Sequence, residues 1–185
     1  MTRDITLGNF VVKFNNNTGE IVKYVSGNGN LEIPSEIDGV TVKSIGRSAF
    51  NSCYCLEYVS IPNTVNSINI TAFNYCRNLK AVNIAGNNMT SIEDNAFSYC
   101  FNLSNICLPD SINFIGAGAF DSCYNLKFIS IPTKITLINN SLFLNCYNLK
   151  SIYIPYGVTS IEESAFYNCL NLVDISIPAS VNLIK

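Results

Sequence analysis

The feature that most constrains this chain is a repeat of about 23 residues that recurs six times. A Phe returns at steps of 23, 24, 23, 23 and 23 residues, with a Cys three residues and a Leu six residues after each one. The Phe residues are Phe50, Phe73, Phe97, Phe120, Phe143 and Phe166. A period of this length is typical of solenoids, in which each repeat buries its apolar side only against its neighbours. The sequence therefore predicts a stack of similar rungs.

Each repeat also contains two aliphatic residues spaced two apart, which is the alternation of a β-strand with both side chains on its inner face. The pairs are Val59 and Ile61, Val82 and Ile84, Ile106 and Leu108, Ile129 and Ile131, Ile152 and Ile154, and Ile175 and Ile177. A Pro follows every pair except the second, where Ala85 stands. Because Pro has no N–H to donate, we expect it to end the strand.

The opposite wall of each rung is predicted from segments such as Ile68–Cys76, INITAFNYC. Ala72, Phe73 and Cys76 lie close to the spacing of one helical turn, so this segment is expected to form a single helical or 3₁₀ turn. Stacked rungs then bury a continuous core, with neighbouring strands about 4.8 Å apart.

The repeated unit L-x-x-I-x-I-P-x-x-V-x-x-I-x-x-x-A-F-x-x-C resembles the BspA-type (Treponema pallidum-type) leucine-rich repeat. Clear copies are LEYVSIPNTVNSINITAFNYC and LKFISIPTKITLINNSLFLNC, and Ala85 and Leu142 are the departures from the pattern. The resemblance covers residues 31–185 and implies a leucine-rich repeat solenoid, with a parallel β ladder and short helical or 3₁₀ turns on the opposite wall. We expect the array of 23-residue units at 31–185 to be truncated at its C-terminal end.

Residues 1–30 are similar to the cap that precedes such arrays. Two alternating segments flank NNNTGE, at 15–20, which reads as a β-hairpin. The run IPSEIDGVTVKSIG then predicts a longer first rung, with Gly39 at an extra turn.

The resemblance also implies a cell-surface or secreted protein that takes part in adhesion and protein binding. Our leading hypothesis is a non-catalytic binding module for a protein, such as a host or extracellular-matrix protein. The alternative is a rigid structural spacer within a larger surface protein, without a ligand of its own.

Outward-facing strand residues are the candidate binding surface, because this sheet is the usual docking face of leucine-rich repeat proteins. Aromatic side chains there supply contact area at low entropic cost. The alternative for these residues is ordinary cross-strand packing. The candidates are Tyr58, Ser60, Asn83, Asn105, Phe128, Ser130, Tyr153, Tyr156 and Asp174.

A second aromatic series follows the Cys position, and its regular spacing favours a structural ladder over a binding site. It comprises Tyr54, Phe101, Tyr124 and Tyr147, with Tyr75, Tyr99 and Tyr167 nearby. Six of the eight Cys residues share one inward repeat position, which favours buried reduced thiols over disulfides or a metal site. Cys107 instead falls on an outward strand position.

Composition argues against other classes of function. The chain has no His, no G-x-S-x-G, no P-loop and no H-E-x-x-H, so we expect neither an enzyme nor a metal or cofactor site. The net charge is −2 without a basic run, which argues against nucleic-acid binding, and no apolar run is long enough to insert into a membrane. Weak self-association through the apolar C-terminal rung is expected.

Overall fold

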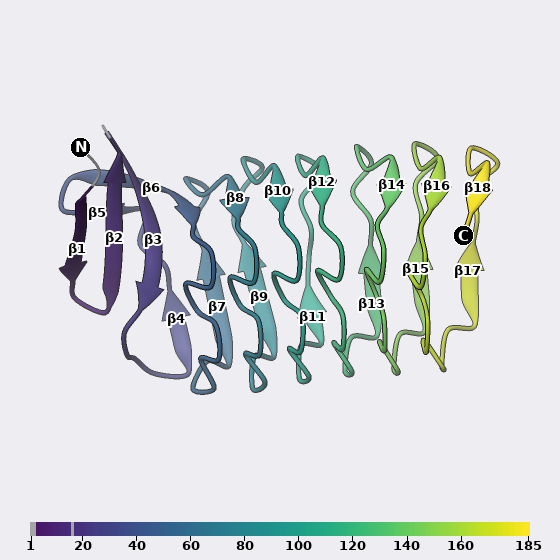
Figure 1. Ribbon diagram of the computed structural model, residues 1–185, viewed down its shortest axis with the longest axis horizontal. Helices are drawn as coiled ribbons and strands as arrows, with labels where there is room; N and C mark the ends of the chain where they lie inside the picture. Colours follow the sequence, from purple (N-terminus) through teal and green to yellow (C-terminus); the bar gives the residue numbers. More distant parts are fainter. Residues whose placement is uncertain (1–2, 16) are drawn as a thin grey trace.

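The computed structural model describes residues 3–15 and 17–185 as an elongated β-solenoid, with rungs stacked from the N-terminal to the C-terminal end (Figure 1). Three antiparallel strands begin the chain: β1 (Arg3–Leu7), β2 (Phe10–Asn15) and β3 (Thr18–Tyr24). The pairing of β2 with β3 confirms a hairpin at 15–20, although Asn16 lies outside the described residues. β1 was not predicted. It pairs with β2 through all five of its residues.

The first rung contains the extra turn that Gly39 predicts. β5 (Glu36–Ile37) and β6 (Val40–Ile45) pair antiparallel on either side of Asp38 and Gly39, whose φ angles are 52° and 73°. Two consecutive residues in this left-handed region make the tight turn that joins antiparallel strands. β6 then pairs in parallel with β3, which connects the N-terminal hairpin to the array.

The predicted strands form a parallel ladder, which we call the first ladder. Its members pair in register, so that Val59 lies beside Val82 and Ile129 beside Ile152. The inward aliphatic side chains of these four residues are all buried. The first ladder consists of β4 (Asn30–Glu32), β7 (Tyr58–Ile61), β9 (Ala81–Ile84), β11 (Asn105–Ile106), β13 (Phe128–Ser130), β15 (Ser151–Tyr153) and β17 (Asp174–Ser176).

A second parallel ladder, which the sequence did not predict, runs through the Ile that closes each unit. Its members are short, and Ile45, Ile68 and Ile92 lie side by side in successive rungs with their side chains buried. After β6 the second ladder consists of β8 (Ser67–Ile68), β10 (Ser91–Ile92), β12 (Phe114–Ile115), β14 (Leu137–Ile138), β16 (Ser160–Ile161) and β18 (Leu183–Ile184).

The predicted helical or 3₁₀ turns are wrong: no helix occurs in residues 3–15 or 17–185. In their place lies a wall of consecutive turns, residues 69–76 and their equivalents, which we call the turn wall. Thr71 and Tyr75, four residues apart, have φ angles of 56° and 59°, and a right-handed helix cannot contain such left-handed residues.

Hydrogen-bond partners on the turn wall alternate from one residue to the next. The N–H groups of Ala72 and Asn74 donate three residues back within their rung, to Asn69 and Thr71. The N–H of Phe73 instead donates to Ala96 of the next rung, over 2.8 Å. Every second residue therefore bonds across rungs, so the turn wall acts as a third ladder.

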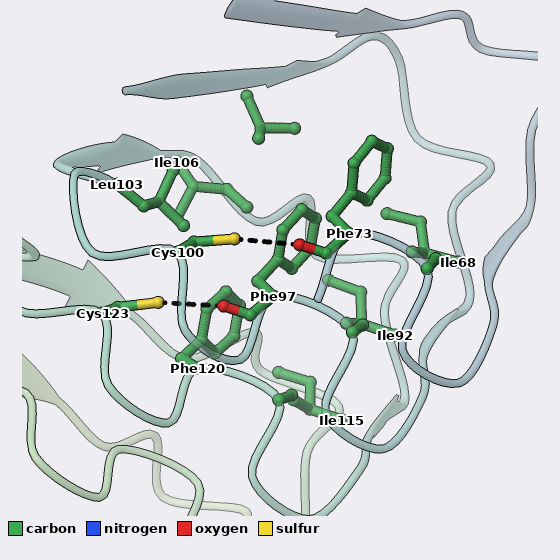
Figure 2. Packing of buried hydrophobic residues seen from close by; sticks show 14 of the residues in the cluster. Ile68, Phe73, Ile92, Phe97, Cys100, Leu103, Ile106, Ile115, Phe120 and Cys123 are labelled. Carbon is green, nitrogen blue, oxygen red and sulfur yellow. Dashed lines mark hydrogen bonds between the residues drawn. The ribbon is translucent and has the colours of Figure 1, made fainter. Parts of the chain in front are cut away.

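The Phe column fills the centre of the stack (Figure 2). Phe73 and Phe97 are fully buried, with ring centroids 5.2 Å apart and ring planes within 3° of parallel. The same stacking joins all six repeat Phe residues, at centroid distances from 4.7 to 5.7 Å. Each ring stacks on the ring of the neighbouring rung, so the same aromatic residue is favoured in every repeat. This explains why Phe recurs at this position.

The Cys column lies beside it, and all eight Cys residues are free. Four of the six repeat thiols are fully buried, as the pattern predicts: Cys76, Cys100, Cys123 and Cys146. Cys53 and Cys169, at the two ends of the column, are half-buried. Each of the four buried thiols also donates a hydrogen bond that the pattern did not reveal. Cys100 Sγ lies 3.2 Å from the Phe73 carbonyl oxygen, and Cys123 Sγ lies 3.3 Å from that of Phe97 (Figure 2). Burial raises the pKa of these thiols well above its usual range, so they remain protonated donors.

Candidate binding surface

The outward side of the first ladder, which we call the strand face, carries the residues that the sequence singled out. Phe128 and Tyr153 are each 61% exposed, Tyr156 is 73% exposed and Tyr58 is 47% exposed. The smaller candidates Asn83, Asn105, Ser130 and Asp174 are also exposed, and Ser60 is half-buried. All nine are therefore accessible at least in part.

Strand register decides which of them are neighbours. On the N-terminal half, Tyr58 lies across from Ala81 and then Asn105, and Ser60 lies beside Asn83, whose amide donates to the Ser60 hydroxyl over 3.4 Å. On the C-terminal half, the pairing of β13, β15 and β17 places Phe128 in line with Asp174 and Ser130 beside Tyr153. Tyr156 follows Pro155 in the turn after β15. The nine candidates thus form two groups.

A break in both ladders separates these groups. In the described part of the chain, β11 does not pair with β13, nor β12 with β14, although every other successive pair in each ladder is joined. We call this interruption the ladder break. Nothing in the repeat pattern predicted it.

Two shallow grooves lie on the strand face, and seven of the nine candidates line them. The N-terminal groove, of about 480 Å³, lies over β4, β7 and β9 and includes Tyr58, Ser60 and Asn83. The C-terminal groove, of about 650 Å³, lies at the ladder break and includes Asn105, Phe128, Ser130 and Tyr153. Tyr156 and Asp174 line neither groove.

Sequence reasoning missed several groove residues. Asn30 and Glu32 of β4 line the N-terminal groove, and they could have been found because LEIP repeats the I-x-I-P pattern one rung earlier. Cys107, which was expected to face outward, is exposed and lines the C-terminal groove. Cys107 lines a groove only because the ladder break lies beside it. The sequence gives no sign of that break.

The N-terminal groove has charged side chains in and beside it, with Glu32 in its lining and Lys80 close to Tyr58. Lys80 forms an exposed salt bridge of 2.6 Å with Glu57 and lies 5.8 Å from the centre of the Tyr58 ring. An exposed pair of this kind contributes little to stability, but it places a cation next to the N-terminal groove. The C-terminal groove has no charged side chain among its described lining residues.

The second aromatic series forms stacked columns at the corner after the Cys position. Tyr75 and Tyr99 stack at 4.4 Å, and Phe101, Tyr124 and Tyr147 stack at 4.6 and 4.8 Å. The rings face one another and so cover one another's faces, which supports a structural role. The guanidinium of Arg77 adds to the cluster, at 5.4 to 5.5 Å from the rings of Tyr54, Tyr75 and Phe101.

Asp121 is the buried carboxylate near this corner. It is 8% exposed and accepts a hydrogen bond of 2.9 Å from the Ser122 hydroxyl. Burial raises the pKa of its carboxyl group above the usual range. Within the part of the chain that the structure describes, no three His, Cys, Asp or Glu side chains gather as metal ligands.

Comparison with known proteins identifies the repeat. The family model of the BspA type leucine rich repeat region matches residues 85–185, with six copies. This chain therefore belongs to the BspA-type leucine-rich repeat family. No curated protein sequence matches it.

Solved structures agree over almost the whole chain. A leucine rich cell surface protein from Faecalibacterium prausnitzii is 34% identical, with a TM-score of 0.91 over 98% of this chain and 50% of that protein. The Treponema pallidum leucine rich repeat protein is 28% identical, with a TM-score of 0.92 over 98% of this chain and 86% of that protein. The present chain thus spans half the length of the F. prausnitzii protein. Among the described residues, no helix has the length and apolarity to cross a membrane.

Proposed function

We propose that this member of the BspA-type family is a non-catalytic protein-binding module of a cell-surface or secreted protein, with its ligand docking on the strand face. The observation that carries the proposal is the exposure of Phe128, Tyr153 and Tyr156, at 61, 61 and 73%. Among the described residues, none of these three rings stacks on another aromatic ring, unlike those of the Phe column and the corner. Large exposed rings without structural partners are typical of recognition surfaces.

The architecture suits this role. The inward positions and the turn wall supply stability, so the outward strand positions are free to vary from rung to rung. The F. prausnitzii protein with the same fold is described as a cell surface protein, which supports the same location for this chain. The absence of His from the sequence removes the commonest general base and metal ligand and argues for binding without catalysis.

The test is binding of the purified chain to extracellular-matrix proteins and intact host cells. The test variant carries Phe128→Ala, Tyr153→Ala and Tyr156→Ala. A matched control removes three exposed aromatic rings elsewhere, Tyr54, Phe114 and Tyr167, which are 50, 41 and 61% exposed.

Saturable binding that the test variant loses and the control variant keeps would support docking on the strand face. Equal loss in both variants would indicate adhesion through any exposed ring and would contradict a defined site. Unfolding midpoints of both variants are measured alongside, so that loss of binding is not mistaken for loss of fold.

A rigid spacer is the second candidate. Its support is the single continuous core, which runs from Phe10 in β2 to Ala165 beyond β16. A continuous core transmits shape along the solenoid without requiring any ligand. Failure of the native chain to bind any matrix protein or cell would favour this function over the first.

A further inference from the structure

The ladder break is open on the strand side and closed on the turn wall. Before the break, the N–H of Ser104 donates to the Lys80 carbonyl over 3.0 Å, and after it the N–H of Lys150 donates to that of Lys127 over 2.9 Å. In the described chain, no equivalent bond joins Lys127 to Ser104. On the turn wall, by contrast, Gly118 and Phe120 donate across the same step, to Asn140 and Leu142, over 2.9 and 3.1 Å. Just before β11 and β13 the rungs are joined as well, because the N–H of Asn125 donates to the Phe101 carbonyl over 3.1 Å. The two rungs therefore separate at the strands of the two ladders, and we call this opening the wedge.

Two side chains bridge the open part of the wedge. Asp110 Oδ1 accepts a hydrogen bond of 3.3 Å from the main-chain N–H of Thr133, in the loops after β11 and β13. Asn139 makes the second bridge. In the following rung the main-chain N–H of Glu162 donates to the carbonyl of Ile138 over 2.9 Å. At the break, the side-chain amide of Asn139 donates to the carbonyl of Ile115 over 2.6 Å. Because a side chain reaches further than a main-chain N–H, Asn139 satisfies this acceptor while the strands stay separate.

The wedge exposes two strand edges. Main-chain groups of successive strand residues point alternately to the two sides. Asn105 donates back to Lys80 over 3.3 Å, so the N–H and C=O of Ile106 point into the break. Ile131 donates forward to Tyr153 over 3.2 Å, so the main-chain groups of Phe128 and Ser130 point into the break from the other side. Such unpaired edges are templates for another strand.

The C-terminal groove lies over these edges and defines what fits. Its volume is about 650 Å³, and its side chains combine aromatic rings with small uncharged groups, namely Phe128, Tyr153, Cys107, Ser130 and Ser151. With no charged side chain in the described lining, the groove complements an uncharged segment and imposes a desolvation penalty on a charged one.

We propose that the ladder break is a β-strand addition site, in which an extended, uncharged segment of a partner protein pairs its main chain with the free edge of β11 or β13. Alternate side chains of that segment contact Phe128 and Tyr153 on the strand face. Main-chain bonds then supply affinity and the two rings supply selectivity. This inference rests on the proposed binding function and specifies its partner as a strand.

The probe is an N-acetylated, C-amidated peptide, Leu-Ser-Asn-Ile-Ser-Leu-Pro, which copies residues 103–109 with Ser in place of Cys107 and carries no charge. Binding to the full chain is measured by fluorescence anisotropy of the labelled peptide. Two N-methylated isomers serve as matched controls, one methylated on odd and one on even peptide nitrogens. Because the donors of an extended strand alternate, each isomer blocks hydrogen bonding along one edge only.

We expect saturable binding of the parent peptide. If the peptide pairs with one edge, one isomer should bind at least tenfold more weakly, equal to about 1.4 kcal/mol, and the other isomer should bind as the parent does. If the peptide pairs with both edges, both isomers should bind more weakly. Absence of parent binding, or three equal affinities, would overturn the proposal. Alkylation of Cys107 in a Cys55→Ser background provides a second test, because the added group fills the groove and should abolish peptide binding, whereas Cys107→Ser should retain it.

The two proposals fail in different ways. Binding to cells that is lost in the Phe128, Tyr153 and Tyr156 variant, with no peptide binding, would keep the protein-binding function and discard strand addition. Hydrogen exchange gives an independent measure of the edges. The N–H groups of Ile106, Phe128 and Ser130 should exchange at least tenfold faster than that of Asn83 in the unbroken ladder, and equal protection would show that the break is closed in solution.

Discussion

Replacing Phe97 by Ala tests whether the Phe column holds the solenoid together. Phe97 is fully buried and stacks on two neighbours, Phe73 at 5.2 Å and Phe120 at 5.7 Å. Burial of a Phe side chain contributes about 1.5–3 kcal/mol, and each aromatic pair about 0.5–1.5 kcal/mol more. We therefore expect Phe97→Ala to lower the free energy of unfolding by about 4 kcal/mol, within the range for buried Phe→Ala changes.

Phe166→Ala is the matched control, because Phe166 is half-buried and stacks on Phe143 alone, at 5.7 Å. With one pair and less buried area, we expect it to lower the free energy of unfolding by about 2 kcal/mol. Urea unfolding followed by far-ultraviolet circular dichroism and Tyr fluorescence measures both, since the chain has no Trp. Equal losses at the two sites would refute the reasoning that stability accumulates through contacts between neighbouring rungs.

Three further predictions follow from the turn wall and the thiols. Thr71 is β-branched yet has a φ of 56°, so Thr71→Gly should raise the free energy of unfolding by about 1 kcal/mol, whereas Thr136→Gly should lower it; a loss in both variants would contradict strain at Thr71. Cys55 and Cys107 are exposed, so a thiol reagent should label these two first in the native chain, and mass spectrometry should find the buried Cys76, Cys100, Cys123 and Cys146 labelled only on unfolding. Burial raises the pKa of Cys53 from 9.0 to about 11, so its neutral form stabilises the fold below pH 9 and this contribution is lost as the pH rises through 11. The decline in urea midpoint over that window should be smaller in Cys53→Ala, and an identical decline would argue against this linkage.

The inward half of the fold could be predicted because it depends on local pattern. Side chains along a strand point alternately to its two faces whatever surrounds the strand. The sequence therefore predicted that Val59 and Ile61 face inward, and they are 2 and 0% exposed. The effect of Pro could be predicted for the same reason, because a residue without an N–H ends the strand pairing at its own position. At Ala85, where the Pro is missing, the N–H donates to the Ile61 carbonyl over 2.9 Å, which adds a ladder bond that Pro cannot make. Leu142 replaces an Ala in the motif and is fully buried, so neither departure disturbs the fold.

The turn wall could not be predicted from spacing, because two backbone arrangements present side chains at similar intervals. Phe73 and Cys76 lie inward in either a helical turn or a chain of turns. The difference lies in φ at Thr71 and Tyr75, residue types that do not require the left-handed region. What stabilises it is the bond from each alternate N–H to the next rung, and no single repeat contains that partner.

The ladder break could not be predicted from the sequence either, because the repeats on its two sides match the same pattern. They are LSNICLP and LKFISIP. It is a property of how two rungs stack. Its local marks are two bridging side chains, Asn139 in place of a main-chain donor and Asp110 as an acceptor from Thr133. Inward positions vary little from rung to rung, since every neighbour must fit them. Outward positions carry no such constraint: the first outward column contains Tyr58, Ala81, Asn105, Phe128, Ser151 and Asp174. In a solenoid of near-identical rungs, selectivity can arise only where rungs differ. We therefore expect selectivity to come from the outward side chains and from the ladder break, and Phe128 lies at both.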